Sequence, residues 1–190
     1  MIDLLQIPDF LDAATLRELG RELRLAGGGP ATVLSQQPEG RVAPLVRKST
    51  RIVVSPETRE RIRGRLLERK AEIEEHFGLP LTECEEPQFL RYEVGDFFVP
   101  HQDGNTPLIR DESRFRRISA VVFLSTPSPE PAPDTYGGGE LVFHGPYTGP
   151  ALRVPVAPPP GTLVAFRAET THEVTPVTHG ERYTIVSWFR

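Results

Sequence analysis

The chain has 190 residues, of which 38% are hydrophobic and 25% are charged, and its formal net charge is -4. This composition predicts a soluble globular protein, and its mild acidity argues against nucleic acid as an obligate partner because phosphate binding needs a basic surface. The single cysteine, Cys84, excludes an internal disulfide, and no apolar run approaches the ~18 residues that span a bilayer.

The chain opens without a charged segment followed by an apolar one, so a leader is not expected and a cytoplasmic location is the default. The length predicts one domain over residues 1–190. Within it, residues 1–85 are expected to be mainly helical support and residues 86–190 to form the core that carries the chemistry. No membrane partner is expected, and the oligomeric state stays undetermined.

Two helices are predicted in the first part of the chain. Asp12 is a suitable N-cap for the first helix, which ends before a Gly-Gly-Gly-Pro stop. Its apolar stripe is formed by Leu16, Leu19, Leu23 and Leu25. The second helix spans residues 55–78, with Ser55 as its N-cap and Gly78 at its end. Between the two helices, the run TRIVV (residues 50–54) predicts a short strand.

From residue 87 onward the pattern changes to short apolar strands separated by Gly and Pro turns. The predicted strands cover residues 89–94, 117–124, 140–144, 161–168 and 182–189. Helices followed by many short strands are typical of an α+β fold, in which these strands would form a jelly roll or a barrel.

The first of these strands leads into an unusual polar pair within RYEVGDFFVPHQDG (residues 91–104). Side chains at positions i and i+2 of a strand share one face, so His101 and Asp103 are expected to point the same way. Two such groups suggest a metal site, provided that a third ligand lies elsewhere. The candidate for this ligand is His172, which follows the strand of residues 161–168.

The other histidines have simpler structural explanations. His76 lies in the last turn of the second predicted helix, where a partly cationic ring favours the helix dipole. His144 ends a predicted strand, which suggests a surface position or a satisfied polar role. His179 precedes Gly180 in a predicted turn and is expected to be exposed.

The ligand types favour an open iron site. Two imidazoles and one carboxylate leave coordination positions free on the metal, as an oxygen-activating iron requires. A closed structural zinc site would use four ligands, usually with cysteines, and this chain has one cysteine. A zinc-dependent hydrolase is a further alternative, which is weakened because no additional histidine or well-placed glutamate base lies near His101.

Arg182 lies in the last apolar strand, ten residues after His172. A buried arginine is costly unless it meets an anion, and its planar fork suits bidentate binding of a carboxylate. Thr184 shares its face by strand alternation and can donate a further hydrogen bond. The alternative is that Arg182 pairs with Glu140 or Glu173 on the sheet surface.

Several ordered motifs together resemble one family. The pattern Tyr-x-x-Gly-x-x-aromatic-x-x-His-x-Asp is similar to the signature of prolyl 4-hydroxylase-like members of the 2-oxoglutarate and Fe(II)-dependent dioxygenases. The residues that carry it are Tyr92, Gly95, Phe98, His101 and Asp103. The run GGGEL (residues 137–141) resembles the opening of a later core strand in that family, and His172 and Arg182 match its distal ligand and its anion-binding residue. The resemblance covers residues 86–190.

This resemblance implies a double-stranded β-helix (jelly-roll) core and a hydroxylase that uses Fe(II), 2-oxoglutarate and O2, with ascorbate as an optional addition. His101, Asp103 and His172 would be the catalytic metal ligands. The cofactor-binding residues would be Tyr92, Arg182 and Thr184, with Arg182 on the distal carboxylate of 2-oxoglutarate. Collagen-type relatives commonly use lysine in place of Arg182, which puts collagen-like substrates in doubt. Trp188 resembles an aromatic residue of the last core strand, where packing explains it as well as function.

The substrate is less well defined by the sequence. The segments of residues 105–117 and 125–139 are expected to overhang the site as loops. Four arginines of the first loop would orient a peptide or acidic substrate, or form a solvated charged loop; they are Arg110, Arg114, Arg116 and Arg117. A prolyl residue in a peptide or protein is the first expectation, and a free amino acid or other small molecule is the second. A non-enzymatic jelly-roll module that binds a metal or anion is the alternative from another functional class.

Overall fold

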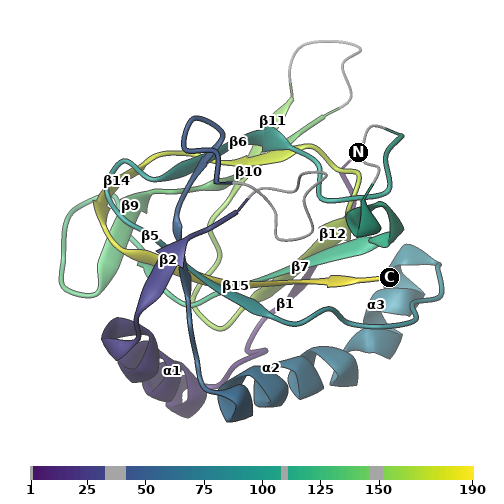
Figure 1. Ribbon diagram of the computed structural model, residues 1–190, viewed down its shortest axis with the longest axis horizontal. Coiled ribbons are helices and arrows are strands. Elements are labelled where there is room, and N and C mark those ends of the chain that lie inside the picture. The colour runs from purple at the N-terminus through teal and green to yellow at the C-terminus, as the bar shows by residue number, and fades with distance from the viewer. Residues whose placement is uncertain (1, 33–41, 108–110, 146–151) are drawn as a thin grey trace.

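The computed structural model describes residues 2–32, 42–107, 111–145 and 152–190. Two sheets face each other as the layers of a sandwich, and the helices lie along the outer face of the larger sheet (Figure 1). In spatial order, the larger sheet consists of β1 (Leu4–Ile7), β12 (Leu163–Arg167), β7 (Ile118–Phe123), β15 (Arg182–Phe189), β5 (Gln88–Tyr92), β4 (Thr50–Ile52) and β2 (Gly28–Pro30). All of its strand pairs are antiparallel.

The smaller sheet supplies the facing layer. Its strands in spatial order are β11 (Arg153–Val156), β10 (Leu141–His144), β13 (His172–Val174), β6 (Phe97–His101) and β3 (Arg47–Lys48). A third, short sheet consists of β14 (Val177–Gly180), β9 (Thr135–Gly138) and β8 (Thr126–Pro127). The predicted α+β fold with a jelly-roll, double-stranded β-helix core is confirmed by this arrangement.

The helices begin where the sequence predicts, and one of them ends early. Helix α1 (Ala13–Leu25) is capped by Asp12, and α2 (Pro56–Glu68) is capped by Ser55. The predicted single helix over residues 55–78 is interrupted at Arg69, and α3 (Lys70–Phe77) follows. The apolar stripe lapses there, because residues 69 and 70 are arginine and lysine. A short 3-10 helix, η1 (Glu112–Phe115), precedes β7.

The first 85 residues contribute strands as well as helices. Strand β1 pairs with β12 and forms one edge of the larger sheet, while β4 pairs with β5 near the other edge. Strand β3 pairs with β6 in the smaller sheet. The predicted run TRIVV corresponds to β4, whereas β1, β2 and β3 were not predicted. The division of the chain at residue 85 stays a prediction.

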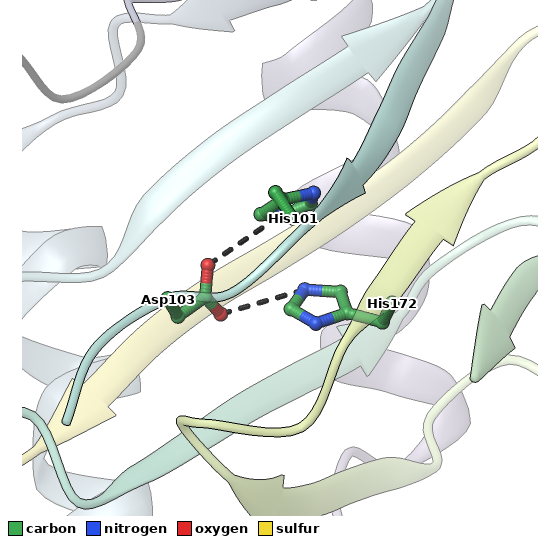
Figure 2. A group of neighbouring side chains, drawn as sticks. All are labelled: His101, Asp103 and His172. Carbon is green, nitrogen blue, oxygen red and sulfur yellow. Dashed lines mark ion pairs between the residues drawn. The ribbon is translucent and has the colours of Figure 1, made fainter. Parts of the chain in front are cut away.

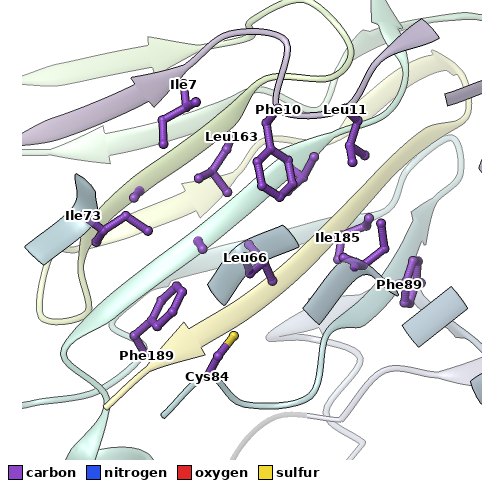
Figure 3. Packing of buried hydrophobic residues seen from close by; sticks show 14 of the residues in the cluster. Ile7, Phe10, Leu11, Leu66, Ile73, Cys84, Phe89, Leu163, Ile185 and Phe189 are labelled. Atoms are coloured by element: carbon purple, nitrogen blue, oxygen red, sulfur yellow. The ribbon is translucent and has the colours of Figure 1, made fainter. Parts of the chain in front are cut away.

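The main hydrophobic core lies between the larger sheet and the helices (Figure 3). Alternate residues of β15, such as Ile185 and Phe189, point into it, and they meet Leu66 of α2 and Ile73 of α3. Leu25, which was expected on the apolar stripe of α1, is 89% exposed because it lies at the end of that helix. None of the helices in the described parts of the chain is long and apolar enough to cross a membrane.

Candidate active site

The other face of β15 borders a cavity between the two sheets, with a volume of about 440 Å³. Arg182, Thr184, Val186 and Trp188 line it, which are the residues that alternate with the core-facing positions of the same strand. Strand alternation thus separates the core under the helices from the cavity, whose wall combines polar and apolar side chains. Every residue that the sequence nominated as a metal or cofactor ligand lines this cavity.

Three of these side chains converge on one point (Figure 2). Strands β6 and β13 pair antiparallel, with His101 directly opposite His172. Asp103 lies two residues after His101, just beyond the end of β6, and its backbone N–H donates a 2.9 Å hydrogen bond to the Ala168 carbonyl. Its two carboxylate oxygens lie 3.4 Å from Nε2 of His101 and 3.5 Å from Nε2 of His172. One potential ligand atom of each residue lies within 4.8 Å of the others.

Both imidazoles are oriented in the same way. Nδ1 of His101 lies 2.8 Å from the carbonyl oxygen of Val99, and Nδ1 of His172 lies 2.9 Å from that of Thr170. A carbonyl oxygen only accepts hydrogen bonds, so Nδ1 carries the proton in each ring. The lone pair is then on Nε2, which faces the centre of the cluster. Metal-binding histidines are commonly fixed by this kind of hydrogen bond.

The protonation states suit a cation. Burial lowers the pKa of His172 to about 4, with a further contribution from the nearby His101, so its ring is neutral at pH 7. Burial alone would raise the pKa of Asp103, but the two histidines and the Trp188 side chain outweigh it and hold this pKa well below its usual range. A neutral His172 imidazole and an ionised Asp103 carboxylate, beside the His101 ring, are donors that suit a divalent metal.

The carboxylate has further support from neighbouring strands. The hydroxyl of Ser119 on β7 donates a 2.7 Å hydrogen bond to Oδ2 of Asp103. The Arg116 guanidinium lies 3.6 Å above the Trp188 ring and donates to both carboxylate oxygens of Glu85, at 3.0 and 2.7 Å. Arg116 lines the cavity together with Asp103, and its guanidinium also donates a 3.4 Å hydrogen bond to the Asp103 carbonyl.

Arg182 is 2% exposed and faces its antiparallel partner Tyr92, with its guanidinium 5.2 Å from the Tyr92 ring centre. Its only described hydrogen bond goes to the Thr184 hydroxyl at 3.4 Å, and its buried Nε has no partner among the described residues. The alternative of a surface ion pair is wrong. Glu173 instead lies 3.2 Å from His144 and also contacts Arg153.

The glycine run flagged in the sequence makes room for this arginine. Gly139 has a φ of +57, and a Cβ built there would lie 2.9 Å from Cδ of Arg182. Both the backbone conformation and the close approach favour glycine at this position. Gly139 of the run GGGEL therefore has a local physical explanation: the missing side chain leaves space for the buried Arg182 side chain next to the backbone.

Several secondary expectations are corrected by the structure. Arg116 does not belong to a solvated loop, because it is 7% exposed and paired with Glu85. Arg117 bonds to Asn105 at 2.8 Å, while Arg110 lies outside the described residues. His179 lies in strand β14 and is half-buried, since its ring packs against Gly137.

Sequence reasoning missed other residues of the cavity wall. Ser119 has a visible signal, because it is a polar residue inside an otherwise apolar strand. Arg47 and Arg51 also line the cavity. Arg51 lies in the run TRIVV, which predicted a strand and no functional role, and Arg47 lies in no predicted element. Their position in the cavity wall depends on how β3 and β4 pair with other strands, which the local sequence does not indicate.

The comparisons with known proteins agree with this geometry. Residues 87–190 match the family model described as the 2OG-Fe(II) oxygenase superfamily. A PKHD-type hydroxylase of Paracoccus denitrificans is 31% identical over 97% of this chain and 77% of that protein. A PKHD-type hydroxylase of Burkholderia ambifaria is 36% identical, over 54% of this chain and 41% of that protein.

Solved structures show the same fold. A Pseudomonas putida prolyl-4-hydroxylase superposes with a TM-score of 0.73 at 26% identity, covering 100% of this chain and 93% of that one. A prolyl hydroxylase of Trichoplax adhaerens, solved with a hypoxia inducible factor peptide, has a TM-score of 0.72 at 15% identity, covering 100% of this chain and 84% of that one.

Proposed function

The chain belongs to the 2OG-Fe(II) oxygenase superfamily, and from this premise we propose that it hydroxylates an unactivated C–H bond of a prolyl residue in a peptide or protein. The enzyme class is that of Fe(II)- and 2-oxoglutarate-dependent hydroxylases. The prolyl substrate is supported by the structure of the Pseudomonas putida prolyl-4-hydroxylase, whose fold matches all of this chain and 93% of that protein. A peptide or protein is the form of substrate that we favour over a small molecule.

The metal ligands in this proposal are His101, Asp103 and His172. Their three donor atoms cluster on one side of the cavity, and both histidines direct a lone pair to the same point. His101 and His172 are paired across β6 and β13, and Asp103 is held by hydrogen bonds from its N–H to Ala168 and from Ser119 to its carboxylate. The three ligands are therefore positioned before a metal binds. This convergence is the single observation that supports the proposal most strongly.

The co-substrate site is built from Arg182, Thr184 and Tyr92. The buried guanidinium has an unpaired Nε and contacts two aromatic rings, so it lacks an anion within the described chain. The distal carboxylate of 2-oxoglutarate would fill this need by a charge-assisted bond. The hydroxyls of Thr184 and Tyr92 would add further hydrogen bonds.

When bound, Fe(II) and 2-oxoglutarate activate dioxygen and replace a substrate hydrogen by hydroxyl, with succinate and carbon dioxide as the other products. The protein holds these reactants in one orientation and limits access of water. Leu141, Val174 and Val186 provide apolar wall beside the metal cluster. Ser119 fixes the carboxylate of Asp103, so that its oxygens stay directed at the cluster.

The proposal is tested by mixing the protein anaerobically with Fe(II) and 2-oxoglutarate. We expect the visible charge-transfer band of the metal chelate, followed by succinate release in air. Asp103→Ala should abolish the band, while Asp134→Ala, a change at an aspartate with an 82% exposed side chain, should preserve it. Absence of the band from the unaltered protein, or an unchanged band in Asp103→Ala, would exclude the assignment.

A further inference from the structure

The cavity wall contains an excess of positive charge. Its lining includes four arginines, namely Arg47, Arg51, Arg116 and Arg182, but one acidic residue, Asp103. Arg116 forms a salt bridge with Glu85, and Arg182 is the proposed partner of the distal carboxylate of 2-oxoglutarate. With Fe(II) and the 2-oxoglutarate dianion bound, the charges of the metal, the co-substrate, Asp103 and Arg182 sum to zero. Two cations, Arg47 and Arg51, are then left without a counter-charge.

Arg47 is 8% exposed although it is charged. Its described hydrogen bonds go to neutral groups, the Ser49 hydroxyl and the Thr32 carbonyl, both at 3.1 Å. Its guanidinium lies 4.8 Å from the ring centre of Phe98, and that ring stacks on His101 with 3.5 Å between centroids. The Phe98 ring therefore contacts both the Arg47 guanidinium and His101, which is one of the proposed metal ligands.

Arg51 lies beside it on the same cavity. Burial of part of its side chain lowers its pKa, and the Arg59 and Arg47 cations lower it further, while Glu86 acts in the opposite direction. No salt bridge to Arg51 is formed within the described chain. Two neighbouring arginines that repel each other are stabilised when one anion binds between them.

The position of these arginines is set by the topology. Strand β3, which contains Arg47, lies at the edge of the smaller sheet and pairs with β6. Three residues later the chain has entered β4 of the larger sheet, where Arg51 pairs opposite Leu90 of β5. The segment therefore crosses from the smaller sheet to the larger one (Figure 1). Both arginines line the cavity between these sheets, which is the same cavity that the three proposed metal ligands line.

We propose that Arg47 and Arg51 bind a carboxylate of the substrate, so that the enzyme selects substrates with an acidic group close to the C–H bond that is hydroxylated. The inference rests on the proposed function, because the charge balance assumes Fe(II) and 2-oxoglutarate. The carboxylate belongs either to an acidic side chain beside a prolyl residue of a peptide or to a free amino acid. Arginine forks recognise both forms through the same bidentate geometry.

The test uses two sets of matched probes. One set contains hexapeptides with a single proline and either glutamate or glutamine at each neighbouring position in turn. The other set is L-proline and L-prolinamide. Product mass and succinate are measured, and KM and kcat are determined separately. We expect the carboxylate member of at least one set to have a KM about tenfold lower than its amide. The set that shows this preference identifies the source of the carboxylate.

Substitutions of the two arginines then test whether they cause the preference for the carboxylate probe over its amide. Arg51→Gln and Arg47→Gln should each reduce the ratio between the acidic and the amide probe by raising KM for the acidic one. Because Arg47 is buried and its replacement can disturb folding, the exposed Arg51 gives the decisive result. Arg51→Glu should further shift the preference toward peptides that carry lysine. Arg69→Gln, which removes an arginine from the helical face, should keep the preference of the unaltered enzyme.

Failure of this inference is distinct from failure of the proposed function. If the chelate band and succinate release are absent, the proposed function fails. If both are present, the inference is overturned by equal KM values for acid and amide probes. It is also overturned if the preference persists in the Arg51 variants, or if no carboxylate-bearing probe of either set is hydroxylated.

Discussion

Replacing Arg182 by glutamine should weaken 2-oxoglutarate binding strongly. The guanidinium is 2% exposed and lacks a described anionic partner, so a bound carboxylate would be its main charge partner. Losing one member of a buried, hydrogen-bonded charge pair costs about 2–4 kcal/mol, which corresponds to about a 30-fold to 1000-fold rise in Kd. Anaerobic titration of 2-oxoglutarate into the Fe(II)-loaded protein, followed by the chelate band, measures this Kd directly.

The same substitution should have a different effect on stability without 2-oxoglutarate. An unpaired buried cation is costly, so Arg182→Gln should leave the free energy of unfolding of the ligand-free protein unchanged or raise it. Addition of 2-oxoglutarate at about 100 times its Kd should stabilise the unaltered protein by about 2.7 kcal/mol, and the variant much less. Urea unfolding with and without 2-oxoglutarate separates these two effects.

Arg167→Gln provides the matched control. Arg167 lies on β12 of the same sheet, but it turns to the helices, where it donates a 2.7 Å hydrogen bond to the Phe77 carbonyl. Its loss should reduce stability and leave the affinity for 2-oxoglutarate unchanged. The reasoning is refuted if Arg182→Gln binds 2-oxoglutarate normally, or if both variants weaken binding equally.

Three further substitutions test the surroundings of the site and the fold. Ser119→Ala removes the 2.7 Å hydrogen bond to Asp103 and should weaken Fe(II) binding about tenfold in a metal titration, whereas Ser119→Thr should restore it. Glu22→Gln disturbs the carboxylate that accepts from Ser55 N–H and the Thr58 hydroxyl, and should lower the free energy of unfolding by about 1 kcal/mol in urea. Burial and Glu181 raise the pKa of Tyr183 to about 12, so the folded protein keeps a proton that the unfolded chain loses near pH 10. Stability should therefore fall from pH 10 to pH 12, and Tyr183→Phe should reduce this fall; an equal fall in both proteins would contradict the reasoning.

The parts of the fold that follow local rules could be predicted from the sequence. Ser55 and Asp12 cap helices because their side chains accept backbone hydrogen bonds three residues ahead, a signal contained in a few adjacent residues. The strand of residues 182–189 was equally clear from its β-branched and aromatic content. The pairing of this strand with β7 and β5 could not be predicted, because hydrogen bonds between strands that are distant in the sequence leave no local pattern.

The site shows the same limit. The i, i+2 spacing predicted that His101 and Asp103 point the same way, and they converge although β6 ends at His101. The approach of His172 instead depends on its pairing opposite His101 across two strands. The family motif supplied that long-range information. Glu22 has no comparable motif: its carboxylate bonds to Ser55 and Thr58, more than 30 residues away, and its local sequence predicts a solvated helix face.

The two faces of β15 explain why the site can accommodate costly groups. Ile185 and Phe189 on one face join the core under the helices, so the sheet is stabilised independently of the cavity. Arg182 lies on the other face, and its buried Nε has no described hydrogen-bond partner, which costs stability. Because apolar burial beneath the sheet offsets this cost, substitutions on the cavity face should alter binding more than folding. The same separation holds on β4 of this sheet, where Ile52 joins the core while Arg51 lines the cavity. Arg51 thus keeps its charge without a described salt bridge on the face where we propose that a substrate carboxylate binds.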